Sequence, residues 1–176
     1  MDVRRLRDPF TALGVALHFL GQRAPFSTFK AADLVSTVDG QIRREHYLMA
    51  LDGQKVAGYI GWALFDNETA DRLTATGEQP SNDLAAKFAK GGDAVWLLTV
   101  AATRTDALRK LLAAGRSLYP GKRILGVRHG AAKDHLVRSM TINPLAESRR
   151  STFATLSGTD DSGTNRTPDD GDTTDA

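Results

Sequence analysis

The amino-acid sequence predicts one domain of the α/β (α+β) class, a mixed sheet with flanking helices, in a chain of 176 residues. An Asp52-Gly53-Gln54-Lys55 turn separates two runs of strand-forming residues, which is a strong hairpin signal. The run 94–101 is almost entirely apolar, as expected of a strand covered on both faces. Helical patterns stand before, between and after these strands, which is the order of a layered α/β fold.

The first helix is expected to begin at Asp8-Pro9, where an N-cap residue precedes a proline in the first turn. Its apolar residues recur at intervals of three and four, which predicts a face turned toward the core. These residues are Phe10, Leu13, Leu17 and Leu20. Arginines precede them, but no small-x-small cleavage site follows, so a core helix is favoured over a signal peptide. No segment is long and apolar enough to cross a bilayer.

The remaining elements follow from local signals of capping and chain reversal. Ser27 is expected to cap a second helix, and Asp66 to cap the helix after the hairpin, while Pro120-Gly121 ends a late helix. In order, the elements are a helix from Asp8 to Leu20, helix 27–41, strands 47–51 and 56–65, a helix through Leu73, a short helix ending at Gly91-Gly92, strand 94–101, helix 106–118 and strand 123–127. In outline this order matches the acetyltransferase-like fold.

Charge is distributed unevenly along the chain. Residues 151–176 hold six aspartates and one arginine, a net −5, so residues 1–150 carry +7. Residues 104–150 alone carry +8, from eleven Lys or Arg against three Asp or Glu, and a surface this basic favours an acidic partner. The end of the chain is too polar to fold, so residues 146–176 are expected to form a disordered acidic tail. Residues 1–9 are then an N-terminal segment and 10–145 the folded domain.

The absence of cysteine excludes disulfides, a thiolate nucleophile and Cys-ligated zinc. It is typical of a reducing compartment, so a cytoplasmic location is expected. The four histidines, at positions 18, 46, 129 and 135, match no metal-binding spacing, so no metal is expected.

A set of residues stands in a definite order along the folded part of the chain. They are Leu13-Gly14, Pro25, Tyr59, Trp62-Ala63, Asn67-Glu68, Gly92-Asp93 with Trp96 three residues further on, and Tyr119-Pro120. This series resembles the toxin-activating lysine-acyltransferases, which fatty-acylate internal lysines of RTX pore-forming toxins with acyl carrier protein as the donor. The resemblance spans roughly residues 10–140. It implies an acetyltransferase-like fold, protein-lysine acyltransferase activity and an RTX-type protein as the acceptor.

The resemblance also implies where a catalytic pair would lie. A lysine amine, with a reference pKa of about 10.4, must lose a proton before it attacks a thioester, and a histidine oriented by a carboxylate is a suitable base. The positions that match the family's histidine and aspartate are Ser27 and Thr99. Neither hydroxyl is a general base at pH 7. His18, in the first helix, is the candidate for a relocated base, although a packed or exposed histidine is the more ordinary interpretation.

The expected acyl donor is acyl carrier protein, with no other cofactor. Coenzyme A is disfavoured because the segment 101–106 has no glycine to let the backbone approach a diphosphate closely. An acidic carrier protein would instead meet basic residues in and around the late helix, which a solvated helix face explains equally well. They are Arg104, Arg109, Lys110, Arg116 and Arg128, with Lys122 and Arg123 beside them.

Three functions are weighed on these grounds. The first is a working acyltransferase with substituted catalytic groups. The second is a catalytically inactive relative that binds acyl carrier protein or a partner protein. Nucleic-acid binding is disfavoured, because the basic residues come with no recognition motif and with few aromatic residues among them. Homodimer formation stays open.

Overall fold

The structure is a computed structural model that describes residues 1–128 and 136–141, with side chains as far as Gly126. These residues lie within one compact unit, 1–143. The elements are β1 (Asp2–Arg4), α1 (Pro9–Gly21), the 3-10 helix η1 (Phe26–Thr28), α2 (Ala31–Arg43), β2 (Tyr47–Asp52), β3 (Lys55–Phe65), α3 (Asn67–Thr76), α4 (Asn82–Lys87), β4 (Ala94–Ala102), α5 (Thr105–Leu118), β5 (Arg123–Arg128) and β6 (Leu136–Thr141). The predicted tail, 146–176, lies outside the described residues, as do His129 and His135.

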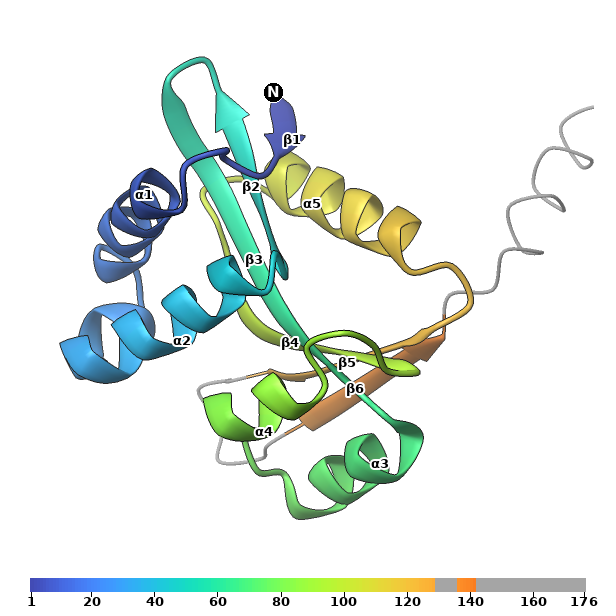
Figure 1. Ribbon diagram of the computed structural model, residues 1–176. Helices are drawn as coiled ribbons and strands as arrows, with labels where there is room; N and C mark the ends of the chain where they lie inside the picture. The colour runs from blue at the N-terminus through green and yellow to red at the C-terminus, as the bar shows by residue number, and fades with distance from the viewer. Residues whose placement is uncertain (129–135, 142–176) are drawn as a thin grey trace, which may run out of the picture. The chain divides into compact units, whose positions relative to one another are not determined.

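The six strands form one mixed sheet in the order β1-β2-β3-β4-β5-β6 (Figure 1). Neighbouring strands run antiparallel except β4 and β5, which are parallel and are connected through α5. A helical crossover is the usual way to join two parallel neighbours. The predicted mixed sheet with flanking helices in a single domain is therefore confirmed.

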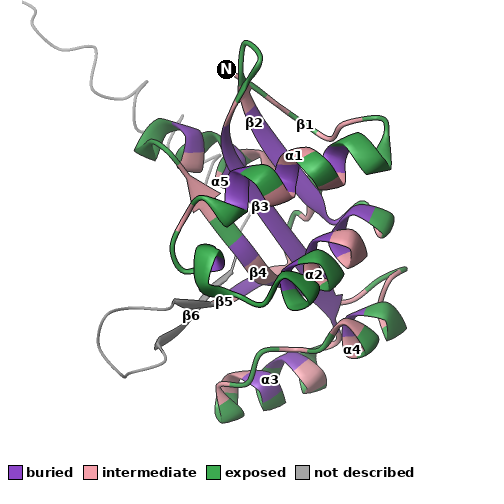
Figure 2. Cartoon of the chain, turned by 90° about the vertical axis from the view of Figure 1, so that its left-hand side faces the viewer, coloured by how far each residue is buried: buried purple, intermediate pink, exposed green. Residues whose placement is uncertain are grey.

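The core lies on both faces of the sheet. Because side chains alternate along a strand, successive residues of β3 contribute to the core on opposite faces of the sheet. Tyr59 packs with α1 and α2 and Phe65 with α3 and α4, whereas Ile60, Trp62 and Leu64 pack with α5 on the other face. Figure 2 shows the resulting layers, with buried strands between helices whose outer surfaces are exposed. Among the described residues, no helix is long and apolar enough to span a membrane.

The two helix caps and the hairpin turn that the sequence predicts are present. The Asp8 carboxylate accepts a hydrogen bond from the Thr11 amide at 2.6 Å and caps α1. The Asp66 carboxylate does the same for the Thr69 amide at 2.8 Å and caps α3. Gly53 has a φ of +61° in the two-residue turn between β2 and β3, a conformation that glycine adopts without strain.

Two helices differ from the prediction. In α1 the buried side is made by Ala12, Ala16, Phe19 and Leu20. Of the predicted face, Leu20 is buried and Leu13 and Leu17 are partly buried against the core, but Phe10 is 78% exposed. The helix is apolar around most of its circumference, so periodicity alone did not identify the two alanines as the closely packed side. Ser27 does not cap α2; it lies in η1, and the chain is extended at Phe29 and Lys30 before α2 begins.

The centre of the sheet contains two irregularities that adjoin each other. The pairing of β3 with β4 shifts register, so that Leu97 faces Trp62 while Thr99 faces Gly61, and Leu98 is an extra residue, a β-bulge. The pairing of β4 with β5 ends at Leu97. From Leu98 to Ala102, β4 pairs with β3 alone among the strands that the structure describes. We call this stretch the open edge of β4.

Candidate functional site

Thr99, one of the predicted catalytic positions, lies at the beginning of the open edge of β4. It is 1% exposed, and its hydroxyl oxygen accepts a hydrogen bond from the Gln41 side-chain amide at 2.9 Å. The carbonyl oxygen of the same Gln41 side chain accepts a hydrogen bond from the Tyr59 hydroxyl at 2.8 Å. We call these three buried side chains, contributed by β4, α2 and β3, the polar chain.

Gln41 reaches the sheet because Gly61 has no side chain. A Cβ atom at position 61 would lie 1.9 Å from the Gln41 side-chain carbonyl oxygen, so the Gln41 amide would have to move away from the sheet. Glycine inside a strand often marks such a close approach. Neither Gln41 nor Gly61 is among the site residues predicted from the sequence. The available signals were a glutamine between Val38 and Ile42 on the buried side of α2 and a glycine within the apolar run of β3.

The polar chain is a set of neutral hydrogen-bond donors. Burial raises the pKa of Tyr59 well above its usual value, so its phenol stays protonated and donates. Gln41 accepts the hydrogen bond from Tyr59 and donates one to Thr99. Consecutive hydrogen bonds of this kind strengthen one another. The Thr99 hydroxyl ends the chain, and its own proton has no acceptor within residues 1–126. Thr99 can therefore donate a hydrogen bond but cannot act as a base.

The other two predicted catalytic positions do not join this chain. Ser27 is exposed in η1, where its backbone amide donates to the Arg23 carbonyl oxygen at 2.9 Å. His18 is exposed on α1, and its Nε2 lies 3.0 Å from the Gln22 side-chain nitrogen. No hydrogen bond connects either residue with Thr99 in the part of the chain with described side chains.

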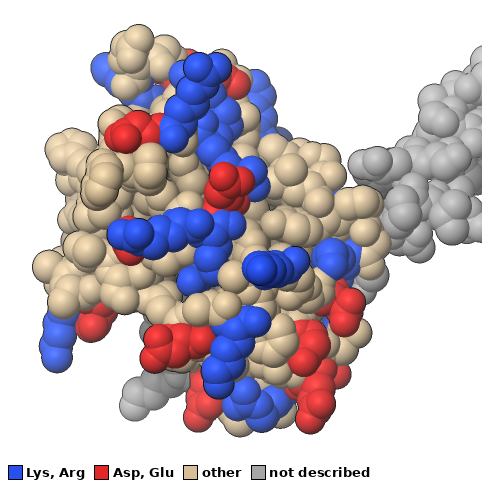
Figure 3. All heavy atoms as spheres, viewed as in Figure 1, with Lys and Arg blue, Asp and Glu red and all other residues tan. Residues whose placement is uncertain are grey.

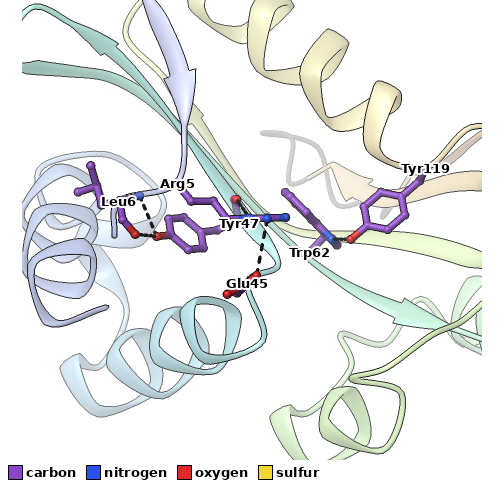
Figure 4. A network of polar contacts seen from close by, with 6 residues as sticks. All are labelled: Arg5, Leu6, Glu45, Tyr47, Trp62 and Tyr119. Atoms are coloured by element: carbon purple, nitrogen blue, oxygen red, sulfur yellow. Dashed lines mark hydrogen bonds and ion pairs between the residues drawn. The ribbon is translucent and has the colours of Figure 1, made fainter. Parts of the chain in front are cut away.

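One histidine, His46, is buried, but on the opposite face. It is 6% exposed and stacks on Trp62, with ring centroids 6.1 Å apart. Burial, with Arg44 and Arg5 nearby, lowers the pKa of His46 from 6.5 to about 4. Trp62 donates its indole proton to the Tyr119 hydroxyl at 3.0 Å (Figure 4). The backbone amide of His46 donates to the Gln41 backbone carbonyl oxygen at 2.8 Å, but its ring stacks on Trp62, which packs on the α5 side of the sheet. The imidazole is therefore turned away from the polar chain, and it is not basic enough at neutral pH to accept a proton readily.

An open hollow of about 630 Å³ lies between the chain before α1 and the end of α2, with Arg5, Phe10 and Arg43 among its lining residues. Its charges are largely paired within the hollow itself. Arg43 lies 2.7 Å from Asp39, and Arg5 lies 3.8 Å from Glu45, the contact drawn in Figure 4. These pairs leave little net charge to attract an ionic ligand.

The predicted basic surface is only partly available. The Arg104 guanidinium is 3.2 Å from Asp52 and 3.1 Å from Asp106, so two carboxylates neutralise it. Arg109, Lys110 and Arg116 are exposed on α5. The side chain of Arg128 lies outside the described residues. Figure 3 shows basic side chains interspersed with acidic ones on the face in view. Within the described residues, no cluster of three His, Cys, Asp or Glu side chains could hold a metal ion.

Comparison with known proteins identifies the fold. No protein-family model and no curated protein matches the chain. A solved structure described as "GphF GNAT-like decarboxylase in complex with isobutyryl-CoA" is 23% identical over 74% of this chain and 68% of that one, with a TM-score of 0.55. An N-acetyltransferase from Staphylococcus aureus Mu50 is 12% identical over 89% of both chains, with a TM-score of 0.42. The predicted acetyltransferase-like fold is thus confirmed, as a GNAT-like fold, while the toxin-activating family is not.

Replacing Gly61 tests the polar chain. We expect Gly61→Ala to lower the free energy of unfolding by about 2–4 kcal/mol, because the new Cβ expels Gln41 and leaves Tyr59 and Thr99 without their partner. Urea denaturation measures this. Gly14→Ala is the matched control, since no atom lies within 4 Å of its Cβ, and it should stabilise α1 by up to about 1 kcal/mol. Equal stability of Gly61→Ala and the natural protein would show that Gln41 does not lie against residue 61.

His46 makes stability depend on pH. Because its pKa is about 4 in the folded protein and about 6.5 in the unfolded chain, only the unfolded chain binds this proton between those values. The free energy of unfolding should therefore fall by up to about 3 kcal/mol as the pH falls from 6.5 to 4. His46→Gln should remove this component, and His18→Gln, at an exposed site, should retain it. Denaturant titrations at each pH measure the free energy of unfolding. If it depends on pH equally in the natural protein and both variants, the burial of His46 is contradicted.

Proposed function

We propose that the protein binds the acyl group of an acyl carrier protein at the open edge of β4 and transfers it to a lysine of a partner protein. The observation that carries this proposal is the separation of β4 from β5 after Leu97, beside the buried polar chain. An unpaired strand edge binds extended chains through its backbone hydrogen-bonding groups. The phosphopantetheine arm of a carrier protein is such a chain, because it carries amide groups along its length.

The surface beside the open edge supports a carrier protein as donor over free coenzyme A. At the N-terminus of α5, Asp52 at the end of β2 and Asp106 in the first turn of α5 flank a single arginine, Arg104, which gives these three residues a net charge of −1. A diphosphate would be repelled there, and no glycine makes room for it. Arg109 and Lys110 are exposed further along α5, where an acidic carrier protein can dock.

The proposed transfer depends on positioning and on neutral hydrogen-bond donors. The neutral lysine nitrogen attacks the thioester carbonyl carbon, the carbon–sulfur bond breaks, and the thiolate leaves. The nitrogen loses its proton to water, and the thiolate takes a proton to become the free thiol of the carrier. With no base at Ser27 or Thr99, the reaction relies on holding the reactants together, which can lower a barrier by several kcal/mol. The resemblance to the toxin-activating acyltransferases suggests an RTX-type protein as the acceptor.

A second function, binding without transfer, is favoured by one observation. Neither Ser27 nor Thr99 can accept a proton at neutral pH, and Thr99 is committed to a hydrogen bond with Gln41. A protein that kept the fold but lost the base would still bind acyl carrier protein or a partner protein. Transfer and binding therefore have to be measured separately.

Intact-mass spectrometry of the acceptor tests the transfer. An RTX-type toxin is incubated with fatty-acyl carrier protein and this protein, and we expect a mass increase of one acyl group per modified lysine. The His18→Ala variant should transfer the acyl group at the natural rate, because His18 is exposed and its hydrogen-bond partner is Gln22, not a residue of the polar chain. Ser27→His/Thr99→Asp, run alongside, restores the residue types of the resembled family. If only that variant transfers the acyl group while the natural protein still binds the carrier, the second function, binding without transfer, is supported. If the natural protein neither binds the carrier nor transfers the acyl group, both functions are refuted.

The basic face of α5 gives a separate prediction about the donor. Arg109→Glu/Lys110→Glu should weaken binding of acyl carrier protein about tenfold at low salt, and the difference should shrink as salt rises. Lys87→Glu/Lys90→Glu makes the same change of charge at exposed positions in and after α4, on the other face of the sheet, and should bind normally. Isothermal titration calorimetry measures both. Equal weakening by the two variants would mean that net charge, not α5, attracts the carrier.

A further inference from the structure

The outer side of α1 is apolar and exposed. Among the α-helices that the structure describes, α1 is the one that contains no Asp, Glu, Lys or Arg. A helix that is apolar around most of its circumference is normally buried on all sides. Here α1 lies at the surface (Figure 2), with Phe10 78% exposed and Gly14, His18 and Gly21 exposed as well. An exposed apolar surface of this kind indicates a binding partner.

Four residues of α1 form one seam along its outer side. Phe10, Gly14, Leu17 and Gly21 follow one another at intervals of four, three and four residues, which is the spacing with which one helix packs along another. The buried residues of α1 lie on the opposite side of the helix. A Cβ atom added at Gly14 or Gly21 would meet open space, so two gaps alternate with two large side chains. We call these four residues the α1 seam.

The α1 seam is complementary to itself when two helices lie antiparallel. Its large and small residues are placed symmetrically about the Val15–Ala16 peptide bond. Phe10 is as far before this bond as Gly21 is after it, and Gly14 and Leu17 are likewise equidistant from it. A twofold axis at this bond therefore sets Phe10 of one copy against the gap at Gly21 of the other. The same axis sets Leu17 of one copy against the gap at Gly14 of the other.

The charges at the two ends of α1 favour the same arrangement. Asp8 precedes the helix and Arg23 follows it, and neither has an ion-pair partner among the described side chains. In an antiparallel pair, Asp8 of one copy is level with Arg23 of the other, so opposite charges attract, whereas in a parallel pair like charges are level. The helix dipoles also favour the antiparallel pair. The seam itself has no charge that would attract an anionic membrane or a charged ligand.

We infer that two copies of this chain associate through the α1 seam as a symmetric antiparallel dimer, an inference that goes beyond acyl transfer and does not depend on it. One side of one helix from each copy buries less area than a standard interface, so we expect a weak association with a dissociation constant of roughly 10–100 µM. Burial of the exposed Phe10 ring contributes to its driving force. Because α5 lies on the other face of the sheet, the dimer leaves the basic surface of α5 exposed.

Analytical ultracentrifugation over a range of protein concentrations tests the association. We expect the natural protein to shift from monomer to dimer as its concentration rises, and Phe10→Glu to weaken the dimer at least about tenfold, because the dimer would then bury two charges. Leu118→Glu makes the same change at an apolar residue that is 43% exposed at the end of α5, and it should associate like the natural protein. A natural protein that stays monomeric at its highest soluble concentration would overturn the inference. Binding of that monomer to vesicles of anionic phospholipid, lost in Phe10→Glu, would assign the seam to a membrane surface instead.

Disulfide cross-linking tests the antiparallel register. The chain has no cysteine, so every cross-link comes from the introduced thiols. We expect Phe10→Cys/Gly21→Cys, oxidised with diamide, to form a covalent dimer, because position 10 of one copy faces position 21 of the other. Within one helix these positions are about 16 Å apart, too far for an internal disulfide, and for the same reason neither single variant should cross-link. A dimer that the double variant does not cross-link, or that a single variant cross-links equally well, would show that the copies do not meet along the α1 seam in this way.

Discussion

The side-chain amide of Gln41 is the interaction on which the centre of this fold depends. A buried amide needs partners at both ends, and here Tyr59 and Thr99 supply them from two neighbouring strands. The amide also needs room above the sheet, which only a glycine at position 61 provides. One side chain from α2 thereby constrains the identity of three residues in the sheet and fixes how α2 lies across β3 and β4. Removing any member leaves a polar group buried without a partner, so these residues act as a unit.

The bulge in β4 makes that interaction possible. In a regular pairing that kept Leu97 opposite Trp62, Thr99 would lie opposite Ile60 and point toward α5, on the face away from Gln41. The extra residue, Leu98, turns Thr99 to the other face, where the hydroxyl completes the polar chain. The same residue begins the stretch in which β4 no longer pairs with β5. The polar chain and the accessible strand edge thus arise from one local irregularity, since a bulge redirects side chains and disturbs pairing at once.

Sequence reasoning succeeded where the determining interactions are local. The caps at Asp8 and Asp66 and the turn at Gly53 involve residues a few positions apart, and all three formed as predicted. In α1 the prediction was right for Leu20 but wrong for Phe10, because a helix that is apolar on most sides can bury any of them. The strand β1 was not predicted, because three residues carry too little pattern. At the site, the resemblance pointed to Thr99, but its partner Gln41 is 58 residues away in sequence, and no local pattern reveals such a contact.

The surroundings of Thr99 suit neutral hydrogen-bonding groups better than a carboxylate. In a histidine–aspartate pair the aspartate stays ionised because the histidine N–H, or another donor, is bonded to it. Position 99 instead lies 1% exposed beneath α2, next to a neutral amide and a phenol whose pKa is raised by burial. A carboxylate there would be costly to ionise, whereas a hydroxyl is well suited to the surroundings. Thr99, Gln41, Tyr59 and Gly61 therefore form a coherent set, and a change at position 99 alone would disturb the chain before it could restore a base.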